Sequence, residues 1–330
     1  MSQSNSSRNP SSISGGSNSA RQSKSSYDAN FEQNMIDGGI YPHNRSSKPK
    51  NTGDTRDYMA RHRPSLSPSQ FGDEDFEEFT NLCNTAGDEA NARADIMSII
   101  AGEARKQHRY TCDRIFNHLE PLAEHLPTPK PDLYDGALPQ QIDRRVRDDL
   151  GKQIVPCNKT SLPAAPNFFL ETKSGAGRAD VAKLQACHDG AVGARAMHSL
   201  QNYGSAENKY DGNAYSYSGT YHQGTSTLAM YSHHPTPPRG LGGPPEYCMT
   251  KLTGFDMTAN VRSFREGASA FRNLRDLGKA HRDNFIDHAN QVARRAPTGT
   301  PSTTLTDGHM SLSVLEDNES DPSTDQLAAE

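Results

Sequence analysis

The sequence predicts a mixed α/β domain between residues 71 and 296, with a polar arm on either side. Apolar residues recur at helical spacing in several segments of this region, which is the pattern of amphipathic helices. Short apolar or alternating runs framed by Pro and Gly predict strands. The two kinds of segment follow one another as helices, strands, helix, strands and helix. That order predicts a small mixed sheet flanked by helices.

The two arms differ from the body in composition. Residues 1–70 are rich in Ser, Asn and Arg, and residues 297–330 are rich in Ser, Thr and acidic residues. Across the whole chain only 32% of residues are hydrophobic, and the mean hydropathy is −0.85. Segments this polar bury too little apolar surface to offset the entropy lost on ordering. We therefore expect both arms to be disordered.

Charge and cysteine usage narrow the class of protein. The N-terminal arm holds nine Lys/Arg and five Asp/Glu, and the C-terminal arm holds seven acids without Lys or Arg, so the body between them is close to neutral. A nucleic-acid site would therefore have to be a local patch. Five cysteines without CxxC spacing argue against a disulfide scaffold or a structural zinc site. With no signal peptide and no long apolar run, we expect an intracellular protein, nuclear or cytoplasmic, without a membrane partner.

The first half of the body is expected to be largely helical. Pro127, Pro129 and Pro131 end this helical region, and the motifs that follow suggest a short extended piece, a helix and a short strand. In order, we predict helices at Asp73–Asn84, Glu89–His108 and Tyr110–His125, an extended turn at Pro131–Gly136, a helix at Pro139–Leu150 and a strand at Ile154–Val155.

The second half is expected to contain the main strands and the longest helices. A buried strand is predicted at Asn167–Leu170, because an apolar run stands between turn residues. The alternation that follows predicts a hairpin whose turn is His222–Ser226. The complete set after the buried strand is a helix over 180–203, hairpin strands at Ala214–Tyr221 and Thr227–His233, a strand at Glu246–Leu252 and a long helix at Thr258–Ala293.

The best candidate for chemistry stands at the end of the buried strand. Glu171 and Lys173 are two positions apart, so both lie on one face of the strand. Buried charges are costly unless they are paired or bind a metal, which favours a functional role. The loop Ser174–Gly177 then leads into a helix that carries Gln185. Although Gly175-x-Gly177 suggests dinucleotide binding, Asp180 replaces the third small residue, and we interpret the loop as a tight turn.

Three motifs in the same order carry a resemblance to a known family. They are PKPDLYDGA (129–137), NFFLETK (167–173) and KLQACHDGAVGARAMHSL (183–200). Together they resemble uncharacterised fungal proteins with a PD-(D/E)XK nuclease-like domain. The resemblance implies a restriction-endonuclease-like core over residues 71–296. It also implies a hydrolase that cleaves nucleic acid with Mg²⁺ or Mn²⁺.

The resemblance also implies roles for individual residues. Asp132 and Glu171 would bind the metal, Lys173 would help to position the attacking water, and Gln185 would be the glutamine of the following helix. Glu89 is the candidate for a further metal ligand on an early helix. Hard oxygen ligands suit Mg²⁺, which lowers the pKa of bound water and stabilises charge on phosphoryl oxygens.

Other interpretations of the same residues remain open. Asp135 and Asp143 are alternatives to Asp132 as the first acid, since Asp after Pro is also ordinary turn chemistry. Glu171 and Lys173 could form a solvated surface pair of little energetic value. Gln185 could be an ordinary polar helix position, and a solvated helix start suits Glu89 better than a ligand role. A catalytically inactive nuclease-fold module, acting as an interaction scaffold, is therefore the alternative function.

Two further groups of polar residues need an explanation. Six basic residues share one arc of the last helix, where a solvated, salt-paired face is favoured over a phosphate-contacting one. The histidines have no metal-ligand spacing, and His222, His233 and His234 are expected to be solvated. The basic arc consists of Arg262, Arg265, Arg272, Arg275, Lys279 and Arg282.

Overall fold

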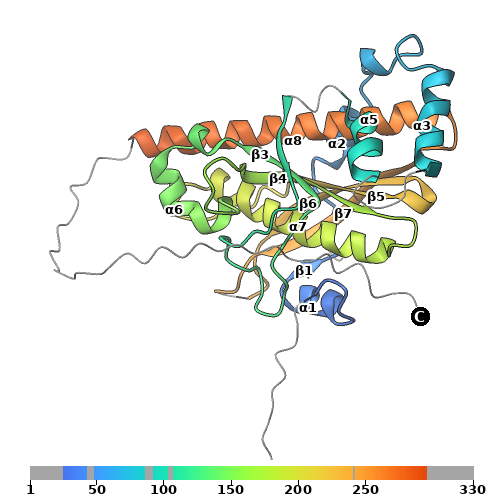
Figure 1. Ribbon diagram of the computed structural model, residues 1–330. Helices are drawn as coiled ribbons and strands as arrows, with labels where there is room; N and C mark the ends of the chain where they lie inside the picture. Colours follow the sequence, from blue (N-terminus) through green and yellow to red (C-terminus); the bar gives the residue numbers. More distant parts are fainter. Residues whose placement is uncertain (1–24, 43–47, 86–91, 103–106, 241, 296–330) are drawn as a thin grey trace, which may run out of the picture. The chain divides into compact units, whose positions relative to one another are not determined.

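The computed structural model describes residues 25–42, 48–85, 92–102, 107–240 and 242–295 (Figure 1). These residues form a seven-stranded mixed sheet with helices on both faces, which confirms the predicted mixed α/β fold. The spatial order is β1-β7-β6-β5-β4-β3-β2, and only β1/β7 and β4/β5 are parallel pairs. The strands are β1 (Ile40–Tyr41), β2 (Arg109–Cys112), β3 (Leu133–Ala137), β4 (Ala164–Lys173), β5 (Ser216–His222), β6 (Thr227–Thr236) and β7 (Glu246–Asp256).

The helices divide between the two faces of the sheet. In Figure 1, α8 runs along one face and α7 lies against the other. The helices are α1 (Phe31–Asp37), α2 (Thr52–Met59), α3 (Asp73–Thr85), α5 (Met97–Ala101), α6 (Arg144–Ile154), α7 (Ala179–Gln201) and α8 (Val261–Arg295). None of the helices in the described ranges is long and apolar enough to cross a membrane.

Strand β4 is the centre of the fold and is buried along its whole length. Its side chains alternate between the two faces. Phe168 and Leu170 join the core on the α8 face, whereas Phe169 packs with Val192 of α7. Because Glu171 and Lys173 continue the series of Phe169, they face α7 rather than α8.

The close packing of α7 on the sheet depends on small residues. A side chain at Gly190 would collide with the ring of His233 on β6, and one at Gly193 would collide with Phe169 and Ser216. His233 is 1% exposed and its Nε2 lies 2.7 Å from Ser218 Oγ. The expectation that His233 and His234 are solvated was therefore wrong: both side chains are buried, and α7 covers the ring of His233.

This packing leads to a prediction about Gly190. We expect Gly190→Ala to lower the free energy of unfolding by about 1–3 kcal/mol, because the added methyl group has no space beside the His233 ring. Gly151→Ala in α6 is the matched control, since its nearest neighbour would be His118 at an ordinary 3.6 Å. That change should stabilise the protein by about 0.5–1 kcal/mol through helix propensity. Urea denaturation measures both, and equal effects would contradict the packing argument.

The predicted third helix, Tyr110–His125, was wrong. Arg109–Cys112 is strand β2, which pairs with β3, and no helix follows it before residue 133. Pro121 interrupts the segment, and Asp113 has φ of 53°, outside the helical region. Phe116 is nevertheless buried, because the irregular chain places its ring against Tyr134. The apolar spacing therefore did not mark a helix, and Ile115 of the same set is 50% exposed.

The boundary of the N-terminal arm also needs correction. Within residues 25–70, Phe31 and Met35 of α1 are buried, and β1 pairs with β7 at the edge of the sheet. A few apolar side chains suffice here, because they pack on a core that the rest of the chain supplies. The predicted disordered tail 297–330 lies outside the described residues. Ile154, expected in a strand, ends α6 instead, while the hairpin and the long last helix are confirmed.

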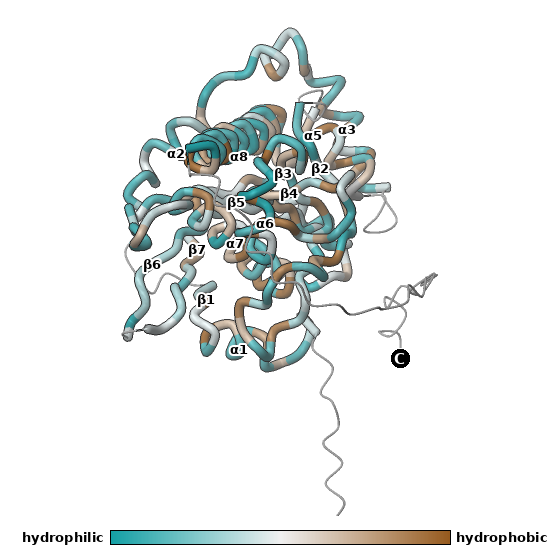
Figure 2. Tube along the Cα trace, turned by 90° about the vertical axis from the view of Figure 1, so that its left-hand side faces the viewer, coloured by the Kyte–Doolittle hydropathy of each residue, from teal (hydrophilic) through white to brown (hydrophobic). Residues whose placement is uncertain are grey.

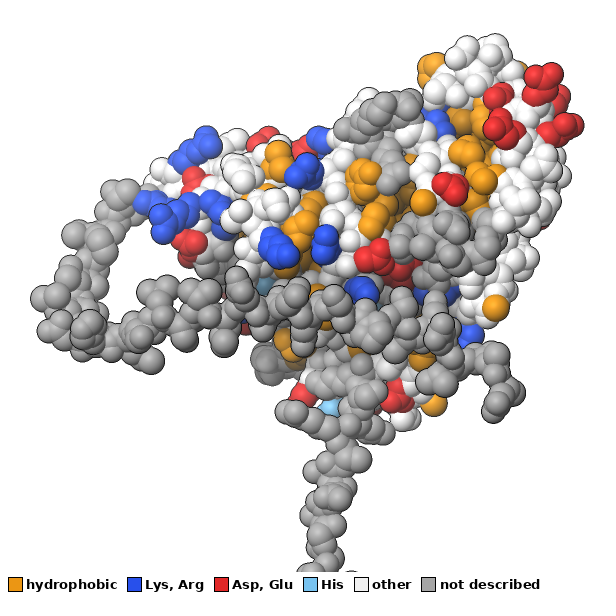
Figure 3. All heavy atoms as spheres, in the orientation of Figure 1, with side chains coloured by type: hydrophobic (Ala, Val, Ile, Leu, Met, Phe, Trp, Pro, Cys, Tyr) orange, Lys and Arg blue, Asp and Glu red, His pale blue; other side chains and the backbone are white. Residues whose placement is uncertain are grey.

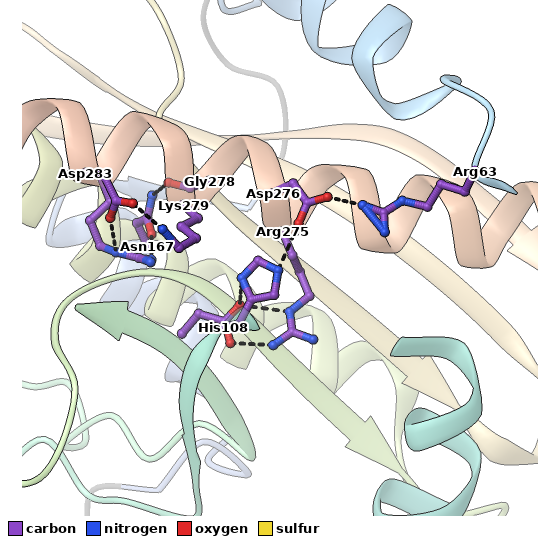
Figure 4. Close-up of polar contacts among 10 residues, drawn as sticks. Arg63, His108, Asn167, Arg275, Asp276, Gly278, Lys279 and Asp283 are labelled. Atoms are coloured by element: carbon purple, nitrogen blue, oxygen red, sulfur yellow. Dashed lines mark hydrogen bonds and ion pairs between the residues drawn. The ribbon is translucent and has the colours of Figure 1, made fainter. Parts of the chain in front are cut away.

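Half of the basic arc of α8 is buried, whereas Arg262 and Lys279 are 85% and 42% exposed and form the expected salt pairs along the helix. Arg272, Arg275 and Arg282 are 7%, 2% and 1% exposed. Arg275 pairs with Asp135 of β3, and Arg282 donates to Asn167 Oδ1 at 2.7 Å. Figure 4 shows these contacts together with the side chain of His108. Arg275 and Arg282 therefore fasten α8 to the sheet, while Arg272 donates to the backbone oxygens of Ile99 and Ile100, so the arc does not form a continuous phosphate-binding face.

The visible surface in Figure 3 separates charge by region. Basic side chains gather over α6 and the C-terminal end of α8, and acidic ones gather over α3. The acidic group begins with Asp73, Glu74 and Asp75, and the basic group includes Arg144, Arg294 and Arg295. This separation agrees with a body that is near neutral overall but has local charged patches.

Candidate functional site

The candidate site lies between β4 and α7, where the start of β3 meets the end of β4. Asp132 and Glu171 are 39 positions apart in the chain, but the antiparallel register that pairs Leu133 with Leu170 sets them side by side. The backbone N–H of Asp132 donates to Glu171 Oε1 at 3.2 Å. Asp132, Glu171 and Lys173 are 9%, 1% and 4% exposed, so they are not a solvated surface group.

Asp132 is held in place by the strand opposite it. Its Oδ2 accepts hydrogen bonds from the backbone N–H of Thr172 at 2.7 Å and from Thr172 Oγ1 at 2.8 Å. Thr172 is fully buried and points to the opposite face from Glu171 and Lys173. The Asp132 carboxylate is therefore bound by Thr172, whereas the backbone N–H of Asp132 contacts Glu171.

Helix α7 contributes a third carboxylate, which the sequence analysis missed. Asp189 is 3% exposed and lies within hydrogen-bonding reach of Glu171. It stands four positions after Gln185, so both residues share the face of α7 that looks onto β4. This i, i+4 relation to Gln185 was the signal that could have identified Asp189.

The buried carboxyl groups of the site lie close together, so ionising all of them at once is unfavourable. Burial, followed by the charges of Asp132 and Asp189, raises the pKa of Glu171 well above its ordinary value, and Lys173 opposes this change. Burial is also the main cause that raises the pKa of Asp189 to about 7. Glu171 and Asp189 titrate as a coupled pair that retains a proton in the neutral range.

Three buried oxygen atoms at the site lack donors. Glu171 Oε2, Asp189 Oδ2 and Gln185 Oε1 receive no hydrogen bond from an N–H or hydroxyl group of the described residues. Leaving such acceptors unsatisfied in a protein interior is costly. A cluster of this kind is suited to hold a proton, a water molecule or a cation.

A glycine-rich turn brings the chain directly from the site to α7. Gly177 N–H donates to Ser174 O at 3.0 Å, and a side chain at Gly177 would collide with Lys173. His222 Nε2 lies 3.0 Å from Gly177 O and braces the turn from β5. The interpretation of Ser174–Gly177 as a tight turn is confirmed.

The other proposed acids do not join this cluster. Asp135 lies on the α8 face, because it is an odd number of residues from Asp132, and it forms a bidentate pair with Arg275. Asp143 caps α6 by accepting from Arg145 N–H at 3.0 Å. The structure therefore places neither alternative to Asp132 in this cluster, and Glu89 lies outside the described residues.

The fold and this site define an α/β protein whose mixed sheet ends in a buried acidic cluster with one lysine. Residues 69–289, more than half of the chain, match a domain of unknown function (DUF7924), and the chain belongs to that family. No match was found among curated proteins. No solved structure matched either.

Proposed function

We propose that this protein is a Mg²⁺- or Mn²⁺-dependent nuclease of the PD-(D/E)XK type, which hydrolyses phosphodiester bonds in nucleic acid. The observation that supports this most is the convergence of Asp132, Glu171 and Lys173, in the motif order of such enzymes, beside buried oxygens without donors. None of the five cysteines, all of which lie in the described residues, forms a disulfide bond, which suits an intracellular, nuclear or cytoplasmic enzyme.

The residues present fit a magnesium ion better than a structural metal. Among the described residues, no three His, Cys, Asp or Glu side chains form a group able to hold a metal on their own. Mg²⁺ commonly binds through only one or two carboxylates and keeps several waters. Glu171 would hold it, and Asp132 and Asp189, whose charges act on Glu171, would be the neighbouring carboxylates. When bound, the ion would lower the pKa of a water and stabilise charge on the phosphate.

The chain's own groups would act around the reacting phosphate. The Lys173 ammonium would stabilise the negative charge that develops on the phosphoryl oxygens as water attacks phosphorus and the P–O bond to the leaving group breaks. Gln185 Oε1, which has no donor among the described residues, is available to accept from the attacking water. Asp189 would carry a proton while the site is free of substrate.

One feature favours the alternative function, a catalytically inactive module that binds nucleic acid or protein. Asp132 Oδ2 already accepts two hydrogen bonds from Thr172, which is an arrangement suited to a structural role. A scaffold of this kind would bind partners without cleaving nucleic acid.

A cleavage assay decides between these functions. The full chain would be incubated with Mg²⁺ or Mn²⁺ and a mixed pool of DNA and RNA, single and double stranded. We expect Lys173→Ala and Glu171→Ala to lower cleavage by about 10²–10³ each, while Lys159→Ala, at an exposed lysine, leaves it unchanged. Circular dichroism would verify that each variant is folded.

Each result has a separate meaning. Loss in both site variants, with the fold retained, would support the nuclease. Equal cleavage by all variants would assign the activity to a contaminant or to another site. If neither metal supports cleavage, the scaffold function is favoured, and nucleic-acid binding by the uncleaved complex becomes the next measurement.

A further inference from the structure

A cavity lies on the α8 face of the sheet, which is the face opposite the acidic cluster. It has a volume of about 560 Å³ and is enclosed by α2, the short 3-10 turn Pro64–Leu66, β7 and the N-terminal part of α8. Figure 2 shows α2 beside α8, with β7 beneath them. The volume is within the range of small-molecule sites, about 300–1,000 Å³.

The floor of this cavity is apolar. Buried or half-buried side chains from four elements converge there, and the polar residues lie around them. The floor residues are Met59, Leu66, Leu252, Phe255 and Ala270. An apolar floor of this kind binds hydrocarbon or aromatic groups through the hydrophobic effect.

The rim is strongly basic. Arg56, Arg61, Arg262 and Arg265 line the cavity, and its one acidic lining residue, Glu266, is paired with Arg262 at 2.8 Å. The two α8 arginines belong to the basic arc singled out in the sequence. Arg262 is bound by Glu266, and Arg265 donates from Nε and Nη2 to the backbone oxygen of Phe71 at 2.9 and 2.7 Å, so these contacts do not join α8 to the sheet.

The rim arginines keep donors for a ligand. Arg56 Nε donates a hydrogen bond to Leu252 O at 3.1 Å, and the Arg61 guanidinium lies 4.0 Å from the centre of the Tyr58 ring. Since each guanidinium has five N–H donors, these contacts leave several of them unspent. Arginine forks of this kind bind carboxylates in a bidentate manner.

We propose that this cavity binds a small amphipathic anion, specifically a long-chain carboxylate such as a fatty acid. Its hydrocarbon chain lies on the apolar floor, and its carboxylate contacts Arg56, Arg61 and Arg262. A nucleic-acid strand suits the site less well, because an apolar floor offers nothing to a phosphate backbone. Part of the wall, α2 and the 3-10 turn, precedes residue 69 and so lies outside the matched family domain. The site is therefore built partly by this chain's N-terminal segment.

The test titrates the full-length protein with a fluorescent fatty acid, 11-(dansylamino)undecanoic acid, below its micelle concentration, with palmitate as competitor. We expect saturable binding of one molecule per chain, displaced by palmitate. Arg61→Glu combined with Arg262→Glu should weaken it at least tenfold. Arg144→Glu, at an exposed arginine of α6, is the matched control and should bind as the wild type does.

Further titrations test the contributions of the ligand's head group and of the apolar floor. Hexadecanol should compete at least tenfold less well than palmitate, and hexadecyl phosphate would show whether the rim prefers phosphate to carboxylate. Ser269→Trp, which fills the cavity from α8, should abolish binding while circular dichroism shows an unchanged fold. Non-saturable binding, equal binding by the charge-reversed variant, or displacement by a single-stranded DNA oligonucleotide but not by palmitate would overturn the proposal.

Discussion

Replacing Arg275 by alanine should lower the free energy of unfolding by about 3–5 kcal/mol, because it leaves a buried carboxylate without its counter-charge. Arg275 Nε and Nη2 donate to the two oxygens of Asp135 at 2.8 and 2.7 Å, and both side chains are at most 2% exposed. The other polar group beside this pair is the ring of His108, whose Nδ1 lies 3.7 Å from Asp135 Oδ2. Urea denaturation followed by circular dichroism would measure the loss.

Two further variants test whether the loss of stability depends on the burial of the Arg275–Asp135 pair. Arg262→Ala removes an arginine that is paired with Glu266 on the same helix but is 85% exposed, so it should cost less than about 1 kcal/mol. The double variant Asp135→Asn with Arg275→Met removes both charges and should recover more than half of the lost stability. A similar loss in Arg275→Ala and Arg262→Ala would show that the pair is not desolvated as the structure indicates.

Replacing Asp189 by asparagine should make the protein more stable, and increasingly so as the pH rises. The pKa of Asp189 in the folded protein is about 7, above its ordinary value of 3.8. Between these values the folded state binds more protons than the unfolded state, so stability falls as pH rises through this window. A shift of this size corresponds to about 4 kcal/mol above pH 7, shared between Asp189 and its coupled partner Glu171.

Urea denaturation at pH 4, 6 and 8 measures this effect. At pH 4 the protonated carboxyl group of Asp189 resembles the amide of asparagine, so the variant and the wild type should have similar free energies of unfolding. At pH 8 the variant should be more stable than the wild type by several kcal/mol. Asp287→Asn, at an exposed acid of α8, is the control and should change stability by less than about 0.5 kcal/mol at every pH. A stability difference independent of pH would show that Asp189 is not a frustrated buried acid.

Together with the cleavage assay, this measurement bears on function. If Asp189→Asn stabilises the fold and also lowers cleavage, the acidic cluster is retained for activity at the expense of stability, as active sites often are. If it stabilises the fold with no change in cleavage, the catalytic role of the α7 carboxylate is excluded.

Local sequence patterns determined much of this protein. The apolar run at Asn167–Leu170 marked the central strand, and the alternation around His222–Ser226 marked the hairpin. Period 2 placed Glu171 and Lys173 on one face, and this holds for any strand because the backbone alternation is local. The motif order also identified Asp132, which the structure brings beside Glu171.

Tertiary structure decided what local patterns do not encode. Phe116 is buried although its segment is irregular. Its ring packs in a hydrophobic cluster, and the hydrophobic effect does not depend on the conformation of the backbone that carries the ring. Helix α1 and strand β1 form by packing on a core that distant segments supply, so the composition of this part of the chain does not report their structure. The choice between Asp132 and Asp135 depended on which face of the sheet each occupies, and Asp189 joined the cluster only through the docking of α7 on β4. The number of charged residues could likewise be counted from the sequence. Whether an arginine of α8 contacts solvent, a ligand or a buried carboxylate depends on the packed fold.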